Sequence, residues 1–566
     1  MLRTAVLALS LLAAGSASAG PMEHAGGLKL DVALQARAES PAGMSKVIVR
    51  THPGRSIDPL LRALGATPGL RLPLVHAQVA LLPDTALRAL AASPDVLTIS
   101  LDRVVHGTIG RTASATGAAW ARAHFDVDGS GIGIAIIDSG VTSWHDDLGT
   151  DRVVHFADFV AGRATAYDDY GHGTHVAGII AGSGYDSGGA RRGMAPGASL
   201  VVLKALDGHG NGFASHVIAA LDYAIEHRER FNIRVINLSV ASGVYESFTT
   251  DPLTVAARRA VDAGIVVVTA AGNFGRSAGG EPMYGGITSP GNAPWVVTVG
   301  AGNHNDTTRR RDDTVAPFSS RGPTHIDRAT KPDLVAPGVG IESLAEAGSL
   351  LFETHAASRL WGTVDTATEP YLSLSGTSMA APVVTGTIAL MLQANPDLTP
   401  NLVKAILHYT AESRPQYDHF SEGAGALNAR GAVQLARELR VGPLPGTPAD
   451  TTRWSRQILW GHQRITGGRL RADANAWRLG VTWGDTQAGA GEPLSWGARE
   501  NEFAEEVAWD TSCRAGACDV VTWATAVGQD TARPCGGNAD CAAVNWRAAA
   551  TARQWRLLLA LPWAVR

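Results

Sequence analysis

The sequence predicts an α/β fold between about residues 112 and 437, with a mostly parallel sheet covered by helices on both faces. Short apolar runs alternate there with longer stretches that suit helices, such as 172–182 and 215–229. Strands that are apolar throughout and separated by helices are typical of a parallel sheet buried on both faces. The predicted strands are GIAIID (133–138), SLVVLKAL (199–206), VINLSV (235–240), IVVVTAAG (265–272) and VVTVGA (296–301).

The first 19 residues predict a secretory signal peptide. Arg3 is followed by an apolar run over 5–14 and by small residues at 17–19, which predicts cleavage after Ala19. A membrane anchor is the alternative, but the run is shorter than the ~20 residues that a span needs. We therefore expect an exported protein, either secreted or held in a periplasm or at a cell surface.

Residues 20–106 precede the α/β region and contain a second, smaller predicted unit at 45–106. Its strands are SKVIVR (45–50), HAQVALL (76–82) and VLTISLD (96–102), and its helices are DPLLRALGA (58–66) and DTALRALAA (84–92). Two strand-helix pairs with short turns predict a compact α+β module. A module of about sixty residues is marginally stable by itself, so we expect it to pack on a neighbour.

Polar residues with catalytic chemistry follow two of the predicted strands. Asp138 ends GIAIID and precedes Ser139 and Gly140, while Asn273 follows IVVVTAAG. Parallel sheets bind ligands at this edge. A carboxylate there can orient a base, and a side-chain amide can donate a hydrogen bond to an oxyanion, although either residue alone is also common in turns.

Two further motifs open predicted helices. In GHGTHVAG, His172 and His175 share a helical face, which would suit a metal, but no third ligand is evident and a single His acting as general base fits better. In GTSMAAP, Ser378 precedes an apolar helix. Taken alone, this serine is interpreted as a helix N-cap rather than as a nucleophile.

The segment 441–452 is rich in Pro, Gly and Thr and is predicted to be a linker. Ten of the 14 tryptophans follow it, several in aliphatic-x-Trp units at 481–483, 494–496, 507–509, 521–523 and 544–546. This pattern predicts a β-rich domain over 453–566. Its tryptophans suit core packing, and a carbohydrate-binding platform is the alternative.

All four cysteines lie within this C-terminal domain, at Cys513, Cys518, Cys535 and Cys541. In an exported chain they predict two disulfides, whose pairing the spacing leaves open. A zinc site is the alternative, but the spacings are wider than those of usual zinc knuckles.

The net charge and its distribution along the chain argue against two classes of partner. The formal net charge of the 566 residues is -4, and no block of like charge stands out. This argues against nucleic acid or an anionic membrane as the main partner, and the sequence contains no apolar run long enough to predict a membrane span.

The motifs DSGV (138–141), HGTHVAG (172–178), AAGN (270–273) and GTSMAAP (376–382) occur in this order, and together they resemble the signature blocks of the subtilisin family of serine peptidases. The segments 317–324 and 331–341 agree with it. The resemblance spans about 112–437, and 45–106 resembles the family's inhibitory propeptide. It implies a subtilisin-like fold and a secreted serine endopeptidase made as a self-inhibited precursor.

The resemblance also implies roles for the motif residues. Ser378 would be the nucleophile, His172 its general base and Asp138 the carboxylate that orients the imidazole. Asn273 would form the oxyanion hole with the backbone N–H of Ser378. His175 would then be a packing residue.

Two segments match those that sandwich the substrate backbone in the family. The candidate substrate-binding residues are Gly210, Asn211 and Gly212 in DGHGNG (207–212) and Ser239, Val240 and Ala241 in SVASG (239–243). Ala241 and Ser242 stand where the family commonly has glycines, which should narrow the primary specificity pocket. Because neither SVASG nor AAGN contains an acidic residue, we expect a preference for medium apolar side chains rather than for Arg or Lys.

The chemistry implied by the resemblance needs no cofactor, and structural calcium is left open. Asp147 matches a calcium ligand position of some family members, but the loop 182–193 lacks the Asn-rich pattern that completes that site. Asp186 in this loop could contribute.

The expected partners are protein or peptide substrates and the chain's own propeptide, which self-cleavage between about Asp102 and Thr112 would release. The ligand of the C-terminal domain is undefined. A catalytically silent scaffold whose C-terminal domain binds an envelope component or polysaccharide is the alternative function. It would be favoured by a replaced catalytic residue, and none is replaced.

Overall fold

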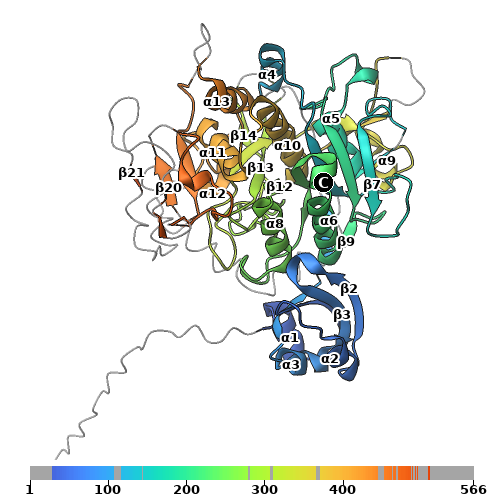
Figure 1. Cartoon of the computed structure of the whole chain (residues 1–566). Coiled ribbons are helices and arrows are strands. Elements are labelled where there is room, and N and C mark those ends of the chain that lie inside the picture. The colour runs from blue at the N-terminus through green and yellow to red at the C-terminus, as the bar shows by residue number, and fades with distance from the viewer. Residues whose placement is uncertain are drawn as a thin grey trace, which may run out of the picture.

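The computed structural model describes residues 29–102, 104–107, 116–142, 144–277, 281–305, 307, 310–364, 370–443, 451–461, 463–466, 470–485, 487–488, 491–492, 494 and 508–509. Within these ranges the chain forms a small N-terminal lobe and a larger body, seen in blue and in green to orange in Figure 1. The predicted signal peptide and all four cysteines lie outside the described residues.

Seven parallel strands build the predicted central sheet of the larger body. The order across the sheet is β7-β8-β6-β10-β12-β13, β15 pairs with β13, and the short β14 (Thr314–Val315) joins β13 in the antiparallel sense. The strands are β6 (Gly133–Asp138), β7 (Val153–Asp158), β8 (Ser199–Lys204), β10 (Ile233–Leu238), β12 (Val266–Ala270), β13 (Val297–Asn303) and β15 (Leu334–Pro337). The predicted α/β class is confirmed.

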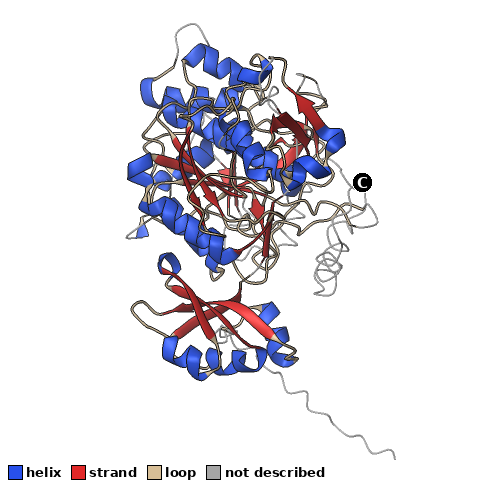
Figure 2. Cartoon of the chain, turned by 90° about the vertical axis from the view of Figure 1, so that its right-hand side faces the viewer, coloured by secondary structure: helices blue, strands red, loops and turns tan. Residues whose placement is uncertain are grey.

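Helices cover both faces of this sheet, as Figure 2 shows. One face carries α5 (His172–Ala181) and α10 (Thr377–Ala394), with α4 (Ala118–Phe125), α11 (Pro400–Thr410) and α13 (Ala429–Val441) sharing their apolar cluster. The other face carries α6 (Ala214–Glu226) and α8 (Pro252–Asp262).

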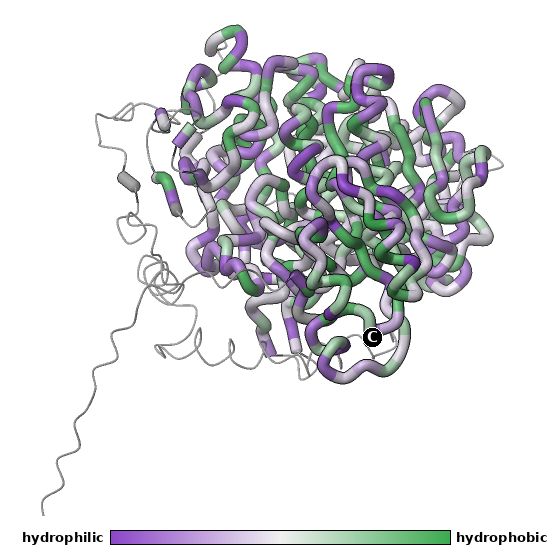
Figure 3. The backbone as a smooth tube through the Cα atoms, turned by 60° about the horizontal axis from the view of Figure 1, so that its bottom comes forward, coloured by the Kyte–Doolittle hydropathy of each residue, from purple (hydrophilic) through white to green (hydrophobic). Residues whose placement is uncertain are grey.

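Strand residues alternate between the two apolar clusters, as the two-residue period of a strand requires. Ile134 and Ile136 of β6 belong to one cluster, and Ala135 and Ile137 belong to the other. The strongly hydrophobic segments accordingly gather inside the larger body in Figure 3. Among the described residues only α10 is long and apolar enough to cross a membrane, and 89% of it is buried in this core.

The N-terminal lobe is an antiparallel sheet in the order β2-β3-β1-β4 with helices on one face. Its elements are α1 (Val32–Glu39), β1 (Met44–Thr51), α2 (Asp58–Ala63), β2 (Thr67–Leu72), β3 (Ala77–Pro83), α3 (Leu87–Ala91) and β4 (Val96–Leu101). The sequence missed α1 and β2, and β2 contains a proline and a glycine that weaken a strand pattern. The other face of this sheet contributes Ile48, Leu72 and Val79 to the cluster of α6 and α8.

The described residues between 451 and 485, named here the C-terminal clasp, pack on helix α11. Trp460, Trp477 and Trp483 are each 2% exposed, and they belong to the same apolar cluster as α10 and α11. The backbone N–H groups of Ser455 and Arg456 donate to carbonyls at the end of α11, at 2.7 and 3.0 Å. The described start of the predicted C-terminal domain therefore shares the core of the larger body.

Strands of the C-terminal region form a three-stranded antiparallel sheet, with β19 (Gln457–Trp460), β20 (Gln463–Thr466) and β21 (Ala508–Trp509). The strand expected at 507–509 is present as β21. The strand expected at 481–483 is wrong, because that segment is irregular and leads into a turn at Trp483. Gly480 and Gly484 flank it with φ angles of 85° and 101°, and the Trp483 indole donates to the carbonyl of Leu459 at 2.7 Å. The units at 494–496, 521–523 and 544–546 lie wholly or partly outside the described residues.

Candidate active site

Three neighbouring strands bring polar residues to one edge of the sheet. Asp138 is the last residue of β6, Ser239 directly follows β10, and Asn273 follows β12 after a two-residue step. Because β6, β10 and β12 are adjacent and parallel, their carboxyl ends lie together. Two helices, α5 and α10, begin at this edge.

The first residue of α5, His172, is paired with Asp138. The Nδ1 atom of His172 lies 2.7 Å from Oδ1 of Asp138, and both side chains are fully buried. An Nδ1–H donated to a carboxylate leaves Nε2 as the basic nitrogen of the ring. The Asp138 oxygen also accepts the Ser139 backbone N–H at 2.7 Å, which fixes the carboxylate in the strand-end turn.

Two glycines allow α5 to approach this turn closely. A Cβ atom at Gly173 would lie 2.1 Å from the carbonyl oxygen of Gly140, so no other residue fits there. Gly140 has a φ of 123°, a conformation that L side chains rarely adopt, and a Cβ there would lie 2.0 Å from the carbonyl oxygen of Tyr167. The small residues of the two motifs thus set the distance between Asp138 and His172.

Asp168 joins the two motifs and was not predicted from the sequence. One oxygen accepts the Ser139 hydroxyl and the Gly171 N–H, both at 2.8 Å, and the other accepts the N–H and hydroxyl of Thr174 at 2.8 and 2.7 Å. Asp168 is 2% exposed. Its carboxylate lies at the N-terminus of α5, where a negative charge is favoured, and ties this helix to the residue after Asp138.

Ser378 is the second residue of helix α10 and not its N-cap. The helix begins at Thr377, with Gly376 in the cap position, so the N-cap interpretation is wrong for this serine. Its hydroxyl donates to the Ser239 carbonyl at 3.1 Å, and the Ser239 hydroxyl donates to the Ser378 carbonyl at 2.8 Å. Ser378 therefore lies beside the end of β10, in the first helical turn, where backbone N–H groups and the helix dipole favour negative charge.

Asn273 is fixed against the same helix end. Its Oδ1 atom accepts both the N–H and the hydroxyl of Thr377 at 3.0 Å, and the Thr377 hydroxyl accepts the Gly272 N–H at 3.1 Å. Because the amide oxygen is held in this way, the orientation of the Nδ2 donor is also set. A preorganised donor beside a helix N-terminus suits a developing oxyanion.

The second histidine of the motif is buried in the core. Nε2 of His175 lies 3.0 Å from the carbonyl oxygen of Leu372, and burial lowers the pKa of His175 to about 3. It packs in the core as a residue of α5, as the sequence predicted. Burial and the nearby Asp138 charge raise the pKa of Tyr170 to about 12, so this phenol stays protonated at neutral pH.

The two candidate substrate-binding segments enclose a third strand. β9 (Asn211–Phe213) and β11 (Val240–Ala241) pair with opposite edges of β5 (Val104–Gly107), and both pairs are antiparallel. Gly107 lies opposite Val240, and His106 lies opposite both Ala241 and Asn211. Of the predicted set, Asn211, Gly212, Val240 and Ala241 pair with β5, Ser239 contacts Ser378, and Gly210 lies in the turn before β9.

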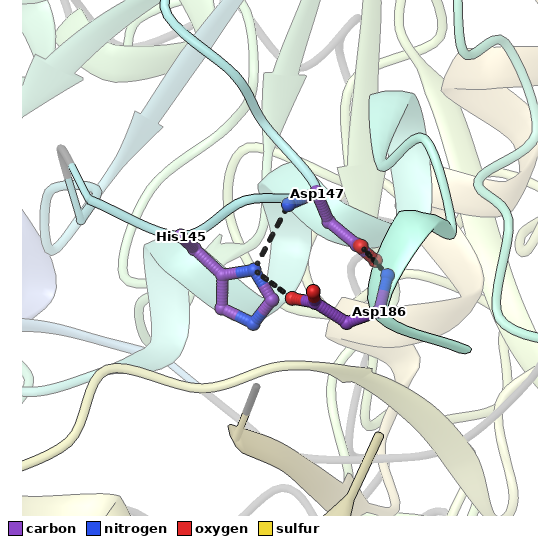
Figure 4. A group of neighbouring side chains, drawn as sticks. All are labelled: His145, Asp147 and Asp186. Atoms are coloured by element: carbon purple, nitrogen blue, oxygen red, sulfur yellow. Dashed lines mark hydrogen bonds and ion pairs between the residues drawn. The ribbon is translucent and has the colours of Figure 1, made fainter. Parts of the chain in front are cut away.

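His145, Asp147 and Asp186 form a buried polar group (Figure 4). The ligand atoms of the three residues lie within 4.8 Å of one another. The Asp147 oxygens accept the Asp186 N–H and the Tyr371 hydroxyl, each at 2.8 Å, and His145 Nδ1 lies 3.5 Å from Asp186 Oδ2. Calcium prefers six to eight oxygen ligands, so an imidazole nitrogen and a carboxylate already engaged on both oxygens fit it poorly.

The sequence and the fold are similar to known proteases. The profile described as the Subtilase family matches residues 129–426. The serine protease AprX of Bacillus subtilis is 41% identical over 310 residues, covering 54% of this chain and 66% of AprX. Subtilisin E of the same species is 32% identical over 363 residues, covering 64% of this chain and 81% of that protein.

Two further similarities concern an extracellular protein and a solved fold. A protein named extracellular serine proteinase, from Thermus sp., is 33% identical over 58% of this chain and 64% of its own length. The crystal structure of fervidolysin from Fervidobacterium pennivorans, titled a keratinolytic enzyme related to subtilisin, matches 81% of this chain and 74% of its own. Its TM-score is 0.55 at 20% identity, which supports the fold alone.

Proposed function

Because the chain belongs to the subtilase family of serine proteases, we propose that Ser378, His172 and Asp138 are the nucleophile, general base and orienting carboxylate of a peptide-bond hydrolase. The observation that carries this proposal is the buried pair of His172 Nδ1 and Asp138 Oδ1 at 2.7 Å, at the sheet edge where α10 begins with Thr377 and Ser378. Each group lies on a helix end or strand end that a packed core holds in place.

In the proposed reaction, His172 Nε2 takes the proton of the Ser378 hydroxyl as its oxygen attacks the carbonyl carbon of the substrate. The carbonyl oxygen becomes the oxyanion, stabilised by Asn273 Nδ2 and the Ser378 backbone N–H. The imidazolium then gives its proton to the leaving amine, and the C–N bond breaks to leave an ester on Ser378. A water molecule, deprotonated by His172, hydrolyses this ester and restores the serine.

Replacing Asn273 tests the proposed oxyanion hole. We expect Asn273→Ala to lower kcat by about 10²–10³ with little change in KM, because the donor acts mainly on charge that develops in the transition state. Asn273→Asp keeps the size of the side chain and lacks the donor, so it should be at least as impaired. Circular dichroism should show both variants folded, and wild-type turnover in folded Asn273→Ala would contradict the assignment.

We also propose that residues 20–106 belong to a propeptide whose tail occupies the active site. The pairing of β5 between β9 and β11 supports this, because it is the backbone pairing that an extended peptide makes with two binding strands. Contacts of the N-terminal lobe with the larger body agree: Asp102 accepts the N–H and hydroxyl of Ser215 at 3.0 and 2.8 Å, and its carboxylate lies 3.0 Å from Lys46 Nζ.

The register of β5 predicts the bond that self-processing cleaves. Gly107 pairs with Val240, and the Ser378 hydroxyl donates to the carbonyl of Ser239, one residue earlier. Thr108, the residue after Gly107, lies outside the described residues, and one more residue of the same antiparallel register would place it opposite Ser239. We therefore expect hydrolysis between Thr108 and Ile109, inside the 102–112 window predicted from the sequence.

N-terminal sequencing of the mature protein measures this directly. The expected new N-terminus is Ile109, with a fragment ending at Thr108 released. An N-terminus before residue 104 would contradict the proposed register, because β5 would then stay attached to the enzyme.

We propose three further properties. The protein is secreted, its active site prefers medium apolar side chains, and its C-terminal domain contains two disulfides. The predicted signal peptide and the extracellular serine proteinase among the relatives support secretion. A peptide library tests the specificity, since a strict requirement for Arg or Lys would exclude the proposed pocket.

A further inference from the structure

A buried lysine lies beside the turn that carries Asp138. Lys204 is the last residue of β8 and pairs with Asp138 in the register of the sheet. Its side chain is 1% exposed. The Lys204 ammonium donates to the backbone carbonyl of Ser139 and, at 2.7 Å, to the carboxylate of Asp169. It also lies 4.6 Å from the centre of the Tyr167 ring.

The Lys204 ammonium has one carboxylate partner and one carbonyl partner. Its carboxylate partner is Asp169, whose side chain is 47% exposed, so solvent screens the charge of Asp169. The other contact is a neutral carbonyl, which belongs to the residue directly after Asp138. Because a buried ammonium is costly to desolvate, and one of its two partners here is a neutral carbonyl, we expect Lys204 to have a function at this position.

Ser139 connects Lys204 to both Asp138 and His172. Its N–H donates to Asp138 Oδ1 at 2.7 Å, and its hydroxyl accepts the N–H of Gly173, the residue after His172, at 2.9 Å. Holding the Ser139 carbonyl therefore restrains the turn that sets the position of Asp138 against His172.

We propose that Lys204 is a positioning residue for the Asp138–His172 pair, and that its charge, moderated by Asp169, disfavours the imidazolium form of His172. This inference rests on the proposed function, because it assigns a task to Lys204 through the proposed general base. A cation close to this pair stabilises the carboxylate and opposes a second positive charge on the ring. The free enzyme then keeps His172 neutral, and thus basic, to lower pH.

Several other groups act on the charge of His172, and the test must separate Lys204 from them. Among the described residues, the titratable or charged groups near His172 or near the residues next to it are Asp138, Asp168, Asp169, Tyr170, His175, Asp207 and Glu346. A change limited to Lys204 and a change limited to Asp169 alter the local charge in opposite senses. The remaining groups are common to both variants.

The experiment is the pH profile of kcat/KM for mature wild type, Lys204→Met and Asp169→Asn. Loss of the cation makes His172 easier to protonate, so the acid limb of Lys204→Met should move to higher pH. Loss of the Asp169 charge should move the acid limb to lower pH. From Coulomb's law at high effective dielectric we expect shifts on the order of half a pH unit. Lys204→Met should also lower kcat, because the Ser139 turn loses its restraint.

Asp262→Asn is the matched control, since it removes the same charge from a 38% exposed side chain on α8, and its profile should match wild type. Shifts of Lys204→Met and Asp169→Asn in the same direction, or no shift, would overturn the inference. If Lys204→Met does not fold, the shift of Asp169→Asn to lower pH still decides the matter, because an unchanged profile contradicts the proposal. An inactive wild-type enzyme would instead contradict the proposed function.

Discussion

Ser378→Ala is expected to remain a full-length precursor after removal of the signal peptide and to lose at least about 10³-fold in peptidase activity. The alanine has no oxygen that can attack a carbonyl carbon, and neither His172 nor Asn273 can replace it. Because β5 already lies between β9 and β11, the precursor should stay folded with its tail in place. Intact-mass measurement reports the processing, and hydrolysis of a peptide substrate reports the activity.

A nearby serine provides the control for this variant. Ser375 is exposed, and its hydroxyl accepts the Gly340 N–H at 3.2 Å. Ser375→Ala should be processed and active like wild type. Normal trimming of purified Ser378→Ala, in the absence of any other protease, would show that a different residue cleaves the chain.

A chain that ends at residue 443 is expected not to fold, because it lacks the C-terminal clasp. The clasp covers α11, where Leu402 and Ile406 belong to the same apolar cluster as Trp477 and Trp483. The loss of one large buried aromatic costs about 3–5 kcal/mol, and a whole domain is stable by about 5–15 kcal/mol. The free energy lost with three buried tryptophans is therefore as large as the whole free energy of unfolding expected for the larger body.

A buried charge cluster under the clasp increases this cost. Lys404 of α11 is 2% exposed, donates to the carbonyls of Pro294 and Val296 at 2.6 and 2.9 Å, and lies 3.0 Å from Asp333. Burial lowers the pKa of Lys404 well below its ordinary value. The ring centre of Trp483 lies 4.7 Å from the Lys404 ammonium, so the clasp covers one side of this charge cluster.

Thermal unfolding of two point variants tests the clasp without truncation. Trp483→Ala should lose about 3–5 kcal/mol, whereas Trp361→Ala, at a side chain that is 60% exposed, should lose less than about 0.5 kcal/mol. A chain ending at 443 that unfolds cooperatively at the wild-type temperature would contradict the assigned role of the clasp.

The fold of the larger body could be predicted because its strands are short and apolar throughout. Each predicted strand, from GIAIID to VVTVGA, overlaps a strand of the sheet, and α5 begins at the predicted His172. The polar residues at the strand ends were recognisable because parallel topology brings them together.

The rest depended on contacts that no local pattern reveals. Asp168 and Lys204 lie in segments that read as a turn and the end of a strand, and their importance comes from partners in other segments. The linker at 441–452 was predicted from composition. Composition cannot show that the tryptophans after this segment pack against α11. Likewise, the place of Ser378 in the helix depends on where the chain leaves β18 (Pro370–Leu374).

The nucleophile can be tested most directly with a serine-directed phosphonylating inhibitor. Mature wild type should gain the mass of one inhibitor group, lose its activity in proportion, and carry the label on the peptide that contains Ser378. Label on another residue, or an active enzyme that the inhibitor never modifies, would contradict the proposed triad.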